Sequence, residues 1–200
     1  MSENYENNNS EELDEEIELT PTQKKIKELL GMVFYVAAVF LICFLIITYV
    51  GQRTQVSGSS MEATLSDGDN LIIDKLSYKL HDPERFDIIV FPYQYEENTF
   101  YIKRIIGLPG ETVWINDMGD IYINGVLLKE NYGMETINYP GAASEPIILG
   151  SDEYFVLGDN RNNSTDSRMD SVGEIKRENI VGKAWVRIYP FDEITFIKHQ

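Results

Sequence analysis

The chain has 200 residues, a formal net charge of −16 and 43% hydrophobic residues. This length suits one well-packed domain with an appended segment, and it excludes solenoids and large multidomain proteins. The negative charge argues against a protein that binds nucleic acid by neutralising phosphates, so no nucleic-acid partner is expected. One cysteine and two histidines exclude an internal disulfide and argue against a multi-histidine metal centre, so we expect no metal site.

The amino-terminal region divides into an acidic segment and an apolar run. Residues 1–20 hold 8 of the 33 acidic residues and no lysine or arginine, which predicts a disordered tail. Residues 32–50, MVFYVAAVFLICFLIITYV, carry no charge. At about 1.5 Å per residue they span roughly 28 Å, close to the ~30 Å hydrocarbon core of a bilayer. We therefore expect an acidic cytoplasmic tail over 1–31, a transmembrane anchor over 32–50 and an extracytoplasmic domain over 51–200.

A cleaved signal peptide is the alternative interpretation of the apolar run. Its apolar region usually has 7 to 15 residues and precedes a small-x-small cleavage site, whereas Gly51-Gln52-Arg53-Thr54 follows this run. Lys24, Lys25 and Lys27 precede the run, and Arg53 is the single basic residue in the twenty positions after it. This asymmetry predicts a single-pass protein with a cytoplasmic amino terminus.

The segment after the anchor is predicted to be mainly β. Short runs of β-branched and aromatic residues alternate there with turn residues, at 69–73, 86–91, 100–106, 113–115, 121–123, 154–157 and 181–189. Asn124-Gly125 predicts a two-residue hairpin before 126–128, because a type I′ turn requires positive φ at both central positions. Residues 131–150, with their prolines and glycines, are predicted to form a long loop.

Two segments could bring reactive side chains together. Residues 58–65, GSSMEATL, place a serine hydroxyl just after the membrane, although small polar residues there are also typical of a linker. Lys103 lies inside a hydrophobic strand, where alternation puts it on one face with Tyr101 and Ile105. It could be an edge-strand lysine whose amine reaches water. To act as a general base instead, its pKa must fall about three units from ~10.4, and burial would supply that shift.

A third polar segment follows the strand predicted at 154–157. Residues 158–168, GDNRNNSTDSR, form either a solvated loop or a hydrogen-bonded scaffold around a buried amine. In the second case Asp166 could pair with Arg168 or Arg104, and Ser164 could orient the amine.

Taken together and in this order, these segments resemble the bacterial type I signal peptidases, the Ser/Lys-dependent membrane proteases that release secreted proteins. The resemblance covers residues 24–189 and is closest to the Gram-positive type. Its motifs are GSSMEATL, GDNLIIDK, RFDIIVF, YIKRIIGLPGETV and GDNRNNSTDSR. It implies a mostly antiparallel β catalytic domain behind one transmembrane helix in the bacterial cell membrane, working without a cofactor.

The resemblance also implies roles for individual residues. Ser60 would be the nucleophile and Lys103 its general base, acting through an acyl-enzyme. Ser164 would hydrogen-bond the lysine amine, and the residues that brace the site would be Asp166, Arg168, Arg104 and Asp159. The positions that match substrate-pocket residues of the family are Met61, Leu65, Tyr101 and Ile102. The implied partners are the signal peptides of preproteins, cleaved after a small-x-small motif, together with the lipid bilayer and the nearby export machinery.

Three positions depart from the family pattern. Gly58 stands where many members have a serine that adds a second oxyanion donor to the backbone N–H of the nucleophile. Ala63 stands where proline is usual, which removes a rigid φ from the turn. Phe86 stands where glycine usually precedes Asp-Ile.

Three alternative functions stay open. A catalytically silent relative could hold a protein during assembly of surface pili without cutting it. A specialised peptidase of the same family could process a few substrates such as pilin subunits. A tethered β-domain could bind ligands only, in which case changing Ser60 would not affect its function.

Overall fold

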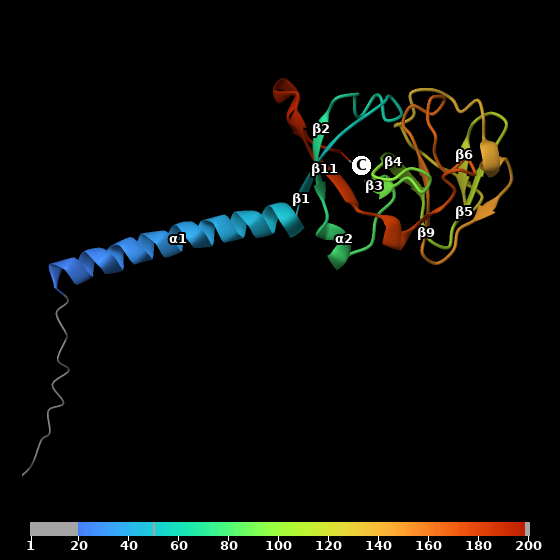
Figure 1. Cartoon of the computed structure of the whole chain (residues 1–200). Helices are drawn as coiled ribbons and strands as arrows, with labels where there is room; N and C mark the ends of the chain where they lie inside the picture. The colour runs from blue at the N-terminus through green and yellow to red at the C-terminus, as the bar shows by residue number, and fades with distance from the viewer. Residues whose placement is uncertain (1–19, 50, 199–200) are drawn as a thin grey trace, which may run out of the picture. The chain divides into compact units, whose positions relative to one another are not determined.

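A computed structural model describes residues 20–49 and 51–198. The tail over residues 1–19, for which the sequence predicts disorder, lies outside the described residues. One long helix, α1 (Pro21–Tyr49), precedes the part of the chain that is rich in strands (Figure 1). It begins with Thr20 and Gln23, which exchange hydrogen bonds in the manner of a capping box, and Pro21 occupies the first helical position. The helix therefore starts at Pro21 and not at Met32, because the lysine-containing segment is helical as well.

The helix α1 has the length and composition of a membrane span. Its segment Pro21–Leu45 is apolar enough to cross a bilayer, and the most apolar part of that segment is not buried by other described residues. A helix that is apolar on every face needs a partner other than water. The prediction of an apolar amino-terminal helix is therefore confirmed.

The remaining described residues form two antiparallel sheets. The larger has the strand order β1-β2-β11-β3-β4-β9-β10, with β12 paired to β11. Its strands are β1 (Gly51–Gln55), β2 (Asn70–Asp74), β3 (Ile88–Pro92), β4 (Phe100–Gly107), β9 (Glu153–Leu157), β10 (Ile175–Lys176), β11 (Gly182–Tyr189) and β12 (Thr195–Phe196). The smaller sheet has the order β7-β6-β5-β8, with β5 (Thr112–Ile115), β6 (Ile121–Ile123), β7 (Val126–Leu127) and β8 (Ile147–Ile148).

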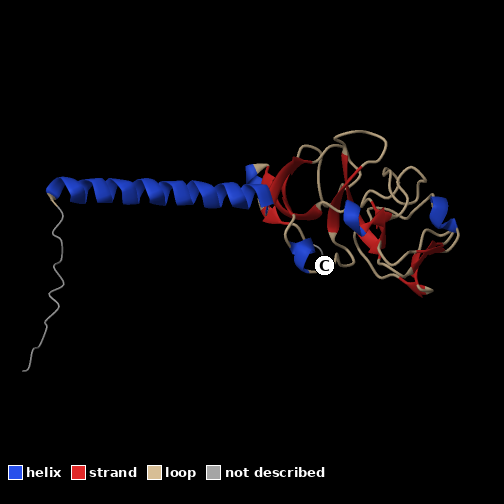
Figure 2. Cartoon of the chain, turned by 60° about the horizontal axis from the view of Figure 1, so that its bottom comes forward, coloured by secondary structure: helices blue, strands red, loops and turns tan. Residues whose placement is uncertain are grey.

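Strands dominate this domain, and the helices in it are short. They are α2 (Ser77–Leu80), η1 (Gly141–Ser144), η2 (Arg177–Asn179) and η3 (Phe191–Glu193). Figure 1 shows β2 and β11 at one end of the domain and β5 and β6 at the other. Figure 2 shows the long loops that connect the strands. The predicted fold class, one apolar helix followed by a mostly antiparallel β domain, is confirmed.

Each of the seven predicted segments contains a strand, and the predicted hairpin is present. Asn124 and Gly125 have φ values of 51° and 77°, as a type I′ turn requires. The sequence analysis missed β1, because its residues GQRTQ are mostly polar and lack an apolar alternation. The loop predicted over 131–150 is real, but it also contains η1 and β8.

The core of the larger sheet is organised around β3. This strand lies between β11 and β4, and Ile88 through Phe91 are all buried. Ile88 and Val90 pack into one apolar cluster with Met61 and residues of β2 and β11, whereas Ile89 and Phe91 pack into another with residues of β4 and β9. Alternating side chains thus fill both faces of the strand.

Candidate active site

Ser60 and Lys103 are 43 positions apart in the sequence and meet in the structure. Ser60 lies in the turn after β1, closed by hydrogen bonds from Glu62 N to Ser59 O (3.0 Å) and from Leu65 N to Met61 O (2.8 Å). Met61 and Leu65 are each 1% exposed, so the core holds the turn in place. Lys103 lies on β4 opposite Ile89 of β3. Its Nζ donates hydrogen bonds to Ser60 Oγ and to Ile102 O, both at 2.9 Å.

Lys103 is buried, with 4% of its surface exposed. Burial lowers the pKa of its amine from 10.5 to about 8, while the carboxylates of Asp166 and Asp159 act in the opposite direction. The Tyr101 ring lies 4.9 Å from Nζ. The alternative of an edge-strand lysine that reaches water is therefore wrong, and the amine is poised to lose its proton near neutral pH.

The loop between β9 and β10 carries a buried ion pair. Arg168 Nε donates to Asp166 Oδ1 at 2.8 Å, and both side chains are almost fully buried. Asp166 also accepts a hydrogen bond from Gly158 N at 3.1 Å, and Arg168 Nη1 donates to Tyr139 O at 3.1 Å. Of the two partners that the sequence left open for Asp166, the structure selects Arg168. Through these contacts the ion pair connects Gly158 and Arg168, at the two ends of the loop, with the segment that contains Tyr139.

Ser164 does not make the hydrogen bond that was expected of it. Its Oγ is buried without a hydrogen-bond partner among the described residues. It packs over Gly158, where an added Cβ would lie 2.2 Å from it. Lys103 Nζ directs its hydrogen bonds to Ser60 and Ile102 instead, so the expected contact between Ser164 and Lys103 is absent from this structure.

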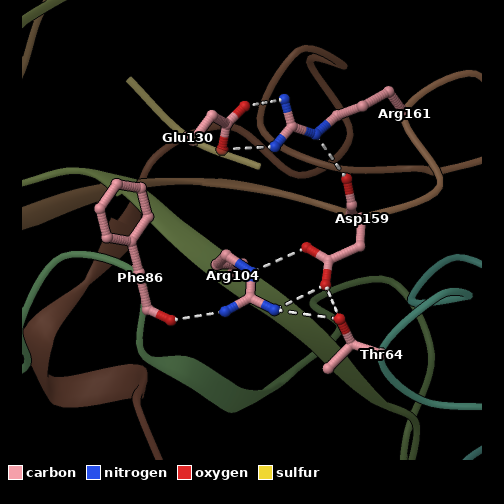
Figure 3. A network of polar contacts seen from close by, with 7 residues as sticks. Thr64, Phe86, Arg104, Glu130, Asp159 and Arg161 are labelled. Carbon is pink, nitrogen blue, oxygen red and sulfur yellow. Dashed lines mark hydrogen bonds and ion pairs between the residues drawn. The ribbon is translucent and has the colours of Figure 1, made fainter. Parts of the chain in front are cut away.

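A second buried ion pair joins Arg104 to Asp159 (Figure 3). Arg104 Nε and Nη2 donate to the two carboxylate oxygens of Asp159 at 2.8 and 2.7 Å, and neither side chain is exposed. Arg104 also donates to Phe86 O at 2.9 Å and to Thr64 Oγ1 at 3.2 Å, and Thr64 Oγ1 donates to Asp159 at 2.5 Å. Because Thr64 belongs to the Ser60 turn, this network links that turn to β4 and to the loop after β9.

The loop after β9 also contacts the Ser60 turn directly. Asn160 N donates to Ser60 O at 3.1 Å, and Asn160 Nδ2 donates to Ser59 O at 3.2 Å. Asn163 Nδ2 donates to Ser59 Oγ at 2.7 Å. The backbone N–H of Ser60 itself donates a hydrogen bond to no described residue. The N–H is therefore available to an oxygen that enters the site.

An open groove of about 350 Å³ runs past Ser60 and Lys103. Met61, Tyr101 and Ile102 line it, as expected for substrate-contacting positions. Leu65 does not line it, because its side chain is buried in the core beside Leu71 and Ile73. Leu65 therefore helps to anchor the turn, and its contact with substrate stays a prediction. Between Phe100 and Lys103, β4 pairs with β3 and with no other described strand, and these residues line the groove, so one backbone edge of β4 is open there.

The positions that depart from the family pattern adopt positive φ. Gly58 has φ 86°, Ala63 has φ 80° and Phe86 has φ 72°. Proline cannot adopt the conformation of Ala63, so the turn here differs in backbone from one that contains proline. A serine at Gly58 would be strained, because a residue with a Cβ is disfavoured at positive φ.

Several residues of the site were given no role by the sequence analysis. Thr64, Asn160 and Asn163 lie inside the motifs quoted above, so their polar side chains were the available signal. Tyr132 lies in a loop that offered no signal, although its ring centroid is 3.7 Å from Arg104 Cζ. Glu130 of the same loop forms an ion pair with Arg161 (Figure 3). Within residues 20–49 and 51–198, no group of three or more His, Cys, Asp or Glu residues could hold a metal ion.

Comparison with known proteins places this chain in a family. Residues 26–189 match the family described as signal peptidase, peptidase S26. A probable signal peptidase I-2 of Synechocystis sp. is 43% identical over 152 residues, which cover 74% of this chain and 67% of the relative. Signal peptidase IB of Staphylococcus aureus is 32% identical over 186 residues, which cover 85% of this chain and 94% of the relative. A solved structure of a signal peptidase I from Enterococcus faecalis aligns with a TM-score of 0.42 and 38% identity, over 52% of this chain and 97% of that one.

The β domain and the matched relatives define an enzyme of the serine endopeptidase class. The chain belongs to the signal peptidase family, peptidase S26, and its resemblance to the bacterial type I signal peptidases is confirmed.

Proposed function

We propose that this chain is a membrane-anchored endopeptidase that removes amino-terminal signal peptides from secreted preproteins, cutting after a small-x-small motif. Ser60 is the nucleophile and Lys103 the general base. The observation that carries this assignment is the 2.9 Å contact between Lys103 Nζ and Ser60 Oγ, made by a lysine that is 4% exposed. The match to the signal peptidase family supplies the substrate class.

Lys103 can act as a general base near neutral pH only because its pKa is lowered. With a pKa of about 8, roughly one amine in eleven is neutral at pH 7. With a pKa of 10.5, about one in 3,000 would be neutral. Burial therefore increases the population of the reactive form about 300-fold. The remaining ammonium form limits the rate at neutral pH, so the rate rises with pH until the amine is neutral.

The reaction proceeds in two covalent steps. The neutral Lys103 amine takes the Ser60 proton as Oγ attacks the scissile carbonyl carbon, and the carbonyl oxygen becomes an oxyanion that accepts a hydrogen bond from Ser60 N–H. The carbon–nitrogen bond then breaks, and the leaving amine takes the proton from the Lys103 ammonium. Water attacks the acyl-enzyme, again giving its proton to Lys103, and the serine hydroxyl is restored when the signal peptide leaves as a carboxylate.

The groove accounts for the proposed preference for small residues. An extended substrate can pair with the open backbone edge of β4 between Phe100 and Lys103, and its alternate side chains then point toward the groove walls. Met61, Tyr101 and Ile102 contribute bulky side chains to those walls. Bulky walls favour small substrate side chains, because a larger side chain would overlap with them.

The membrane arrangement follows from the anchor and the flanking charges. Helix α1 spans the bilayer, with the acidic tail in the cytoplasm and residues 51–200 on the outer side of the bacterial cell membrane. Ser60 then follows the anchor closely in sequence, on the side of the bilayer where a signal peptide emerges. We expect the enzyme to work beside the protein-export machinery, which delivers preproteins to this surface.

The test is cleavage of a labelled preprotein in liposomes by the wild-type chain, Ser60→Ala and Lys103→Met, with the cut mapped by mass spectrometry. The proposal expects a cut after a small-x-small triplet by the wild type alone, at a rate that rises with pH toward a plateau above about 8. If all three proteins bind the preprotein equally and none cuts it, while a known signal peptidase does so in the same liposomes, the chain holds preproteins and does not process them.

A further inference from the structure

The loop that joins β7 to β8 packs directly on the ion pair beneath the active site. Tyr132 in this loop is half-buried, and its ring centroid lies 3.7 Å from Arg104 Cζ. The flanking residues fix the loop at this place. Glu130 pairs with Arg161, and Met134 N donates to Asp159 O at 3.1 Å. Contacts made by residues before and after Tyr132 in the sequence therefore hold its ring against the guanidinium.

The hydrogen bonds of Arg104 explain why a ring fits there. Its guanidinium donates to Asp159, Phe86 O and Thr64, and such bonds lie near the plane of the group. They leave the flat faces without partners. The Tyr132 ring covers one face, where an aromatic ring attracts a cation electrostatically and excludes water. The in-plane hydrogen bonds and the ring against the guanidinium together restrict both rotation and tilting of the guanidinium.

Phe86 also contacts the Tyr132 ring. The Phe86 and Tyr132 rings have centroids 5.3 Å apart. Phe86 has φ 72°, a conformation that is strained for a bulky residue and that glycine adopts freely. The same backbone conformation accompanies the hydrogen bond that Phe86 O accepts from Arg104. A glycine would offer the carbonyl without strain, but it would leave the Tyr132 ring unsupported.

Two short chains of contacts connect Arg104 to the turn that carries Ser60. Asp159, which Arg104 holds through both carboxylate oxygens, directly precedes Asn160, whose backbone N–H donates to Ser60 O. Thr64 of the Ser60 turn contacts both Arg104 and Asp159. A tilt of the guanidinium would therefore displace both attachments of the turn that carries Ser60.

From these contacts we propose that Tyr132 is a positioning residue for cleavage: its ring fixes the Arg104 guanidinium and, through Asp159, the Ser60 turn. The inference rests on the proposed function of Ser60. If the Tyr132 side chain only filled space in the packing, another apolar side chain of similar volume would serve as well. A positioning ring needs its aromatic face, so phenylalanine, which keeps that face, should preserve more of the cleavage rate than leucine.

The experiment compares Tyr132→Phe, Tyr132→Leu and the control Tyr139→Leu, each as the full chain in liposomes. Tyr139 lies in the same loop and is 60% exposed. We expect Tyr132→Leu to lower kcat about fivefold to tenfold with a change in KM below twofold. Tyr132→Phe should lose less than Tyr132→Leu, and Tyr139→Leu should stay within twofold of the wild type. Thr64→Val disturbs the same link from its other side, so adding it to Tyr132→Leu should cost less than the product of the two single losses.

A second readout does not depend on cleavage. In nuclear magnetic resonance spectra of the detergent-solubilised chain, the ring should shift the Arg104 Nε–H resonance upfield. Tyr132→Leu should move that resonance downfield, and Tyr132→Phe should not. If the resonance moves but the wild type cleaves nothing, the proposed function fails and the ring contact stands. The positioning role is overturned if Tyr132→Leu keeps full kcat, if phenylalanine fails as leucine does, or if the losses of Tyr132→Leu and Thr64→Val multiply.

Discussion

Replacing Lys103 by methionine is expected to abolish cleavage and, at neutral pH, to remove a cost to folding. Burial lowers the pKa of Lys103 from 10.5 to about 8, and this difference corresponds to about 3 kcal/mol. Below about pH 8 the folded chain holds a buried ammonium, so the cost is fully present at pH 7. Between pH 8 and 10.5 the folded amine has lost its proton while the unfolded lysine keeps it, so the free energy of unfolding of the wild type rises with pH.

Lys103→Met lacks this titration, and other groups contribute equally to both proteins. The free energy of unfolding of the wild type, relative to that of Lys103→Met, should therefore increase by about 3 kcal/mol between pH 7 and pH 10.5. The measurement is urea unfolding of both full chains in a non-ionic detergent, followed by tryptophan fluorescence. Ser60→Ala is the control, because it is equally inactive but keeps the buried lysine and should follow the wild type. If the difference between wild type and Lys103→Met is the same at both pH values, the argument from burial is refuted.

Three further predictions test other parts of the site. Asp159→Asn leaves the unexposed Arg104 charge without a counterion and should lower the free energy of unfolding by about 3–5 kcal/mol. The control is Asp82→Asn, at an 87% exposed carboxylate that pairs with Arg177, and it should cost less than about 1 kcal/mol. Similar losses for the two variants in urea titrations would contradict this prediction. Gly58→Ser should destabilise the turn by about 1–2 kcal/mol, because φ is 86° there, and should lower the cleavage rate. Faster cleavage in the preprotein assay would instead show that the added hydroxyl donates a hydrogen bond to the oxyanion. Ser164→Ala removes a buried hydroxyl that has no hydrogen-bond partner among the described residues, so the midpoint of urea unfolding should stay constant or rise. A decrease of more than about 1 kcal/mol in the free energy of unfolding would show that the hydroxyl makes a hydrogen bond.

Local features of this protein could be predicted from the sequence alone. The uncharged run that became α1, the seven β-rich segments and the Asn124-Gly125 hairpin all depend on composition, periodicity or the φ requirements of a turn, which are properties of neighbouring residues. Motifs carried the family resemblance in the same way. The polar strand β1 was missed because its pairing with β2, and not its composition, makes it a strand.

The contacts that define the site depend on the tertiary structure. Sheet register decides which side chains meet, because a shift of one residue turns every side chain to the opposite face. The register of β4 with β3 and β9 orients Lys103 toward Ser60 and Arg104 toward Asp159.

Packing decided the remaining contacts. It placed Leu65 in the core and not in the groove, and it left Ser164 over Gly158 without contact to Lys103. It also brought Tyr132 onto Arg104 from a loop with no recognisable motif. Such choices depend on the shape and burial of residues far apart in the chain, so local sequence could supply the reacting groups but not their arrangement.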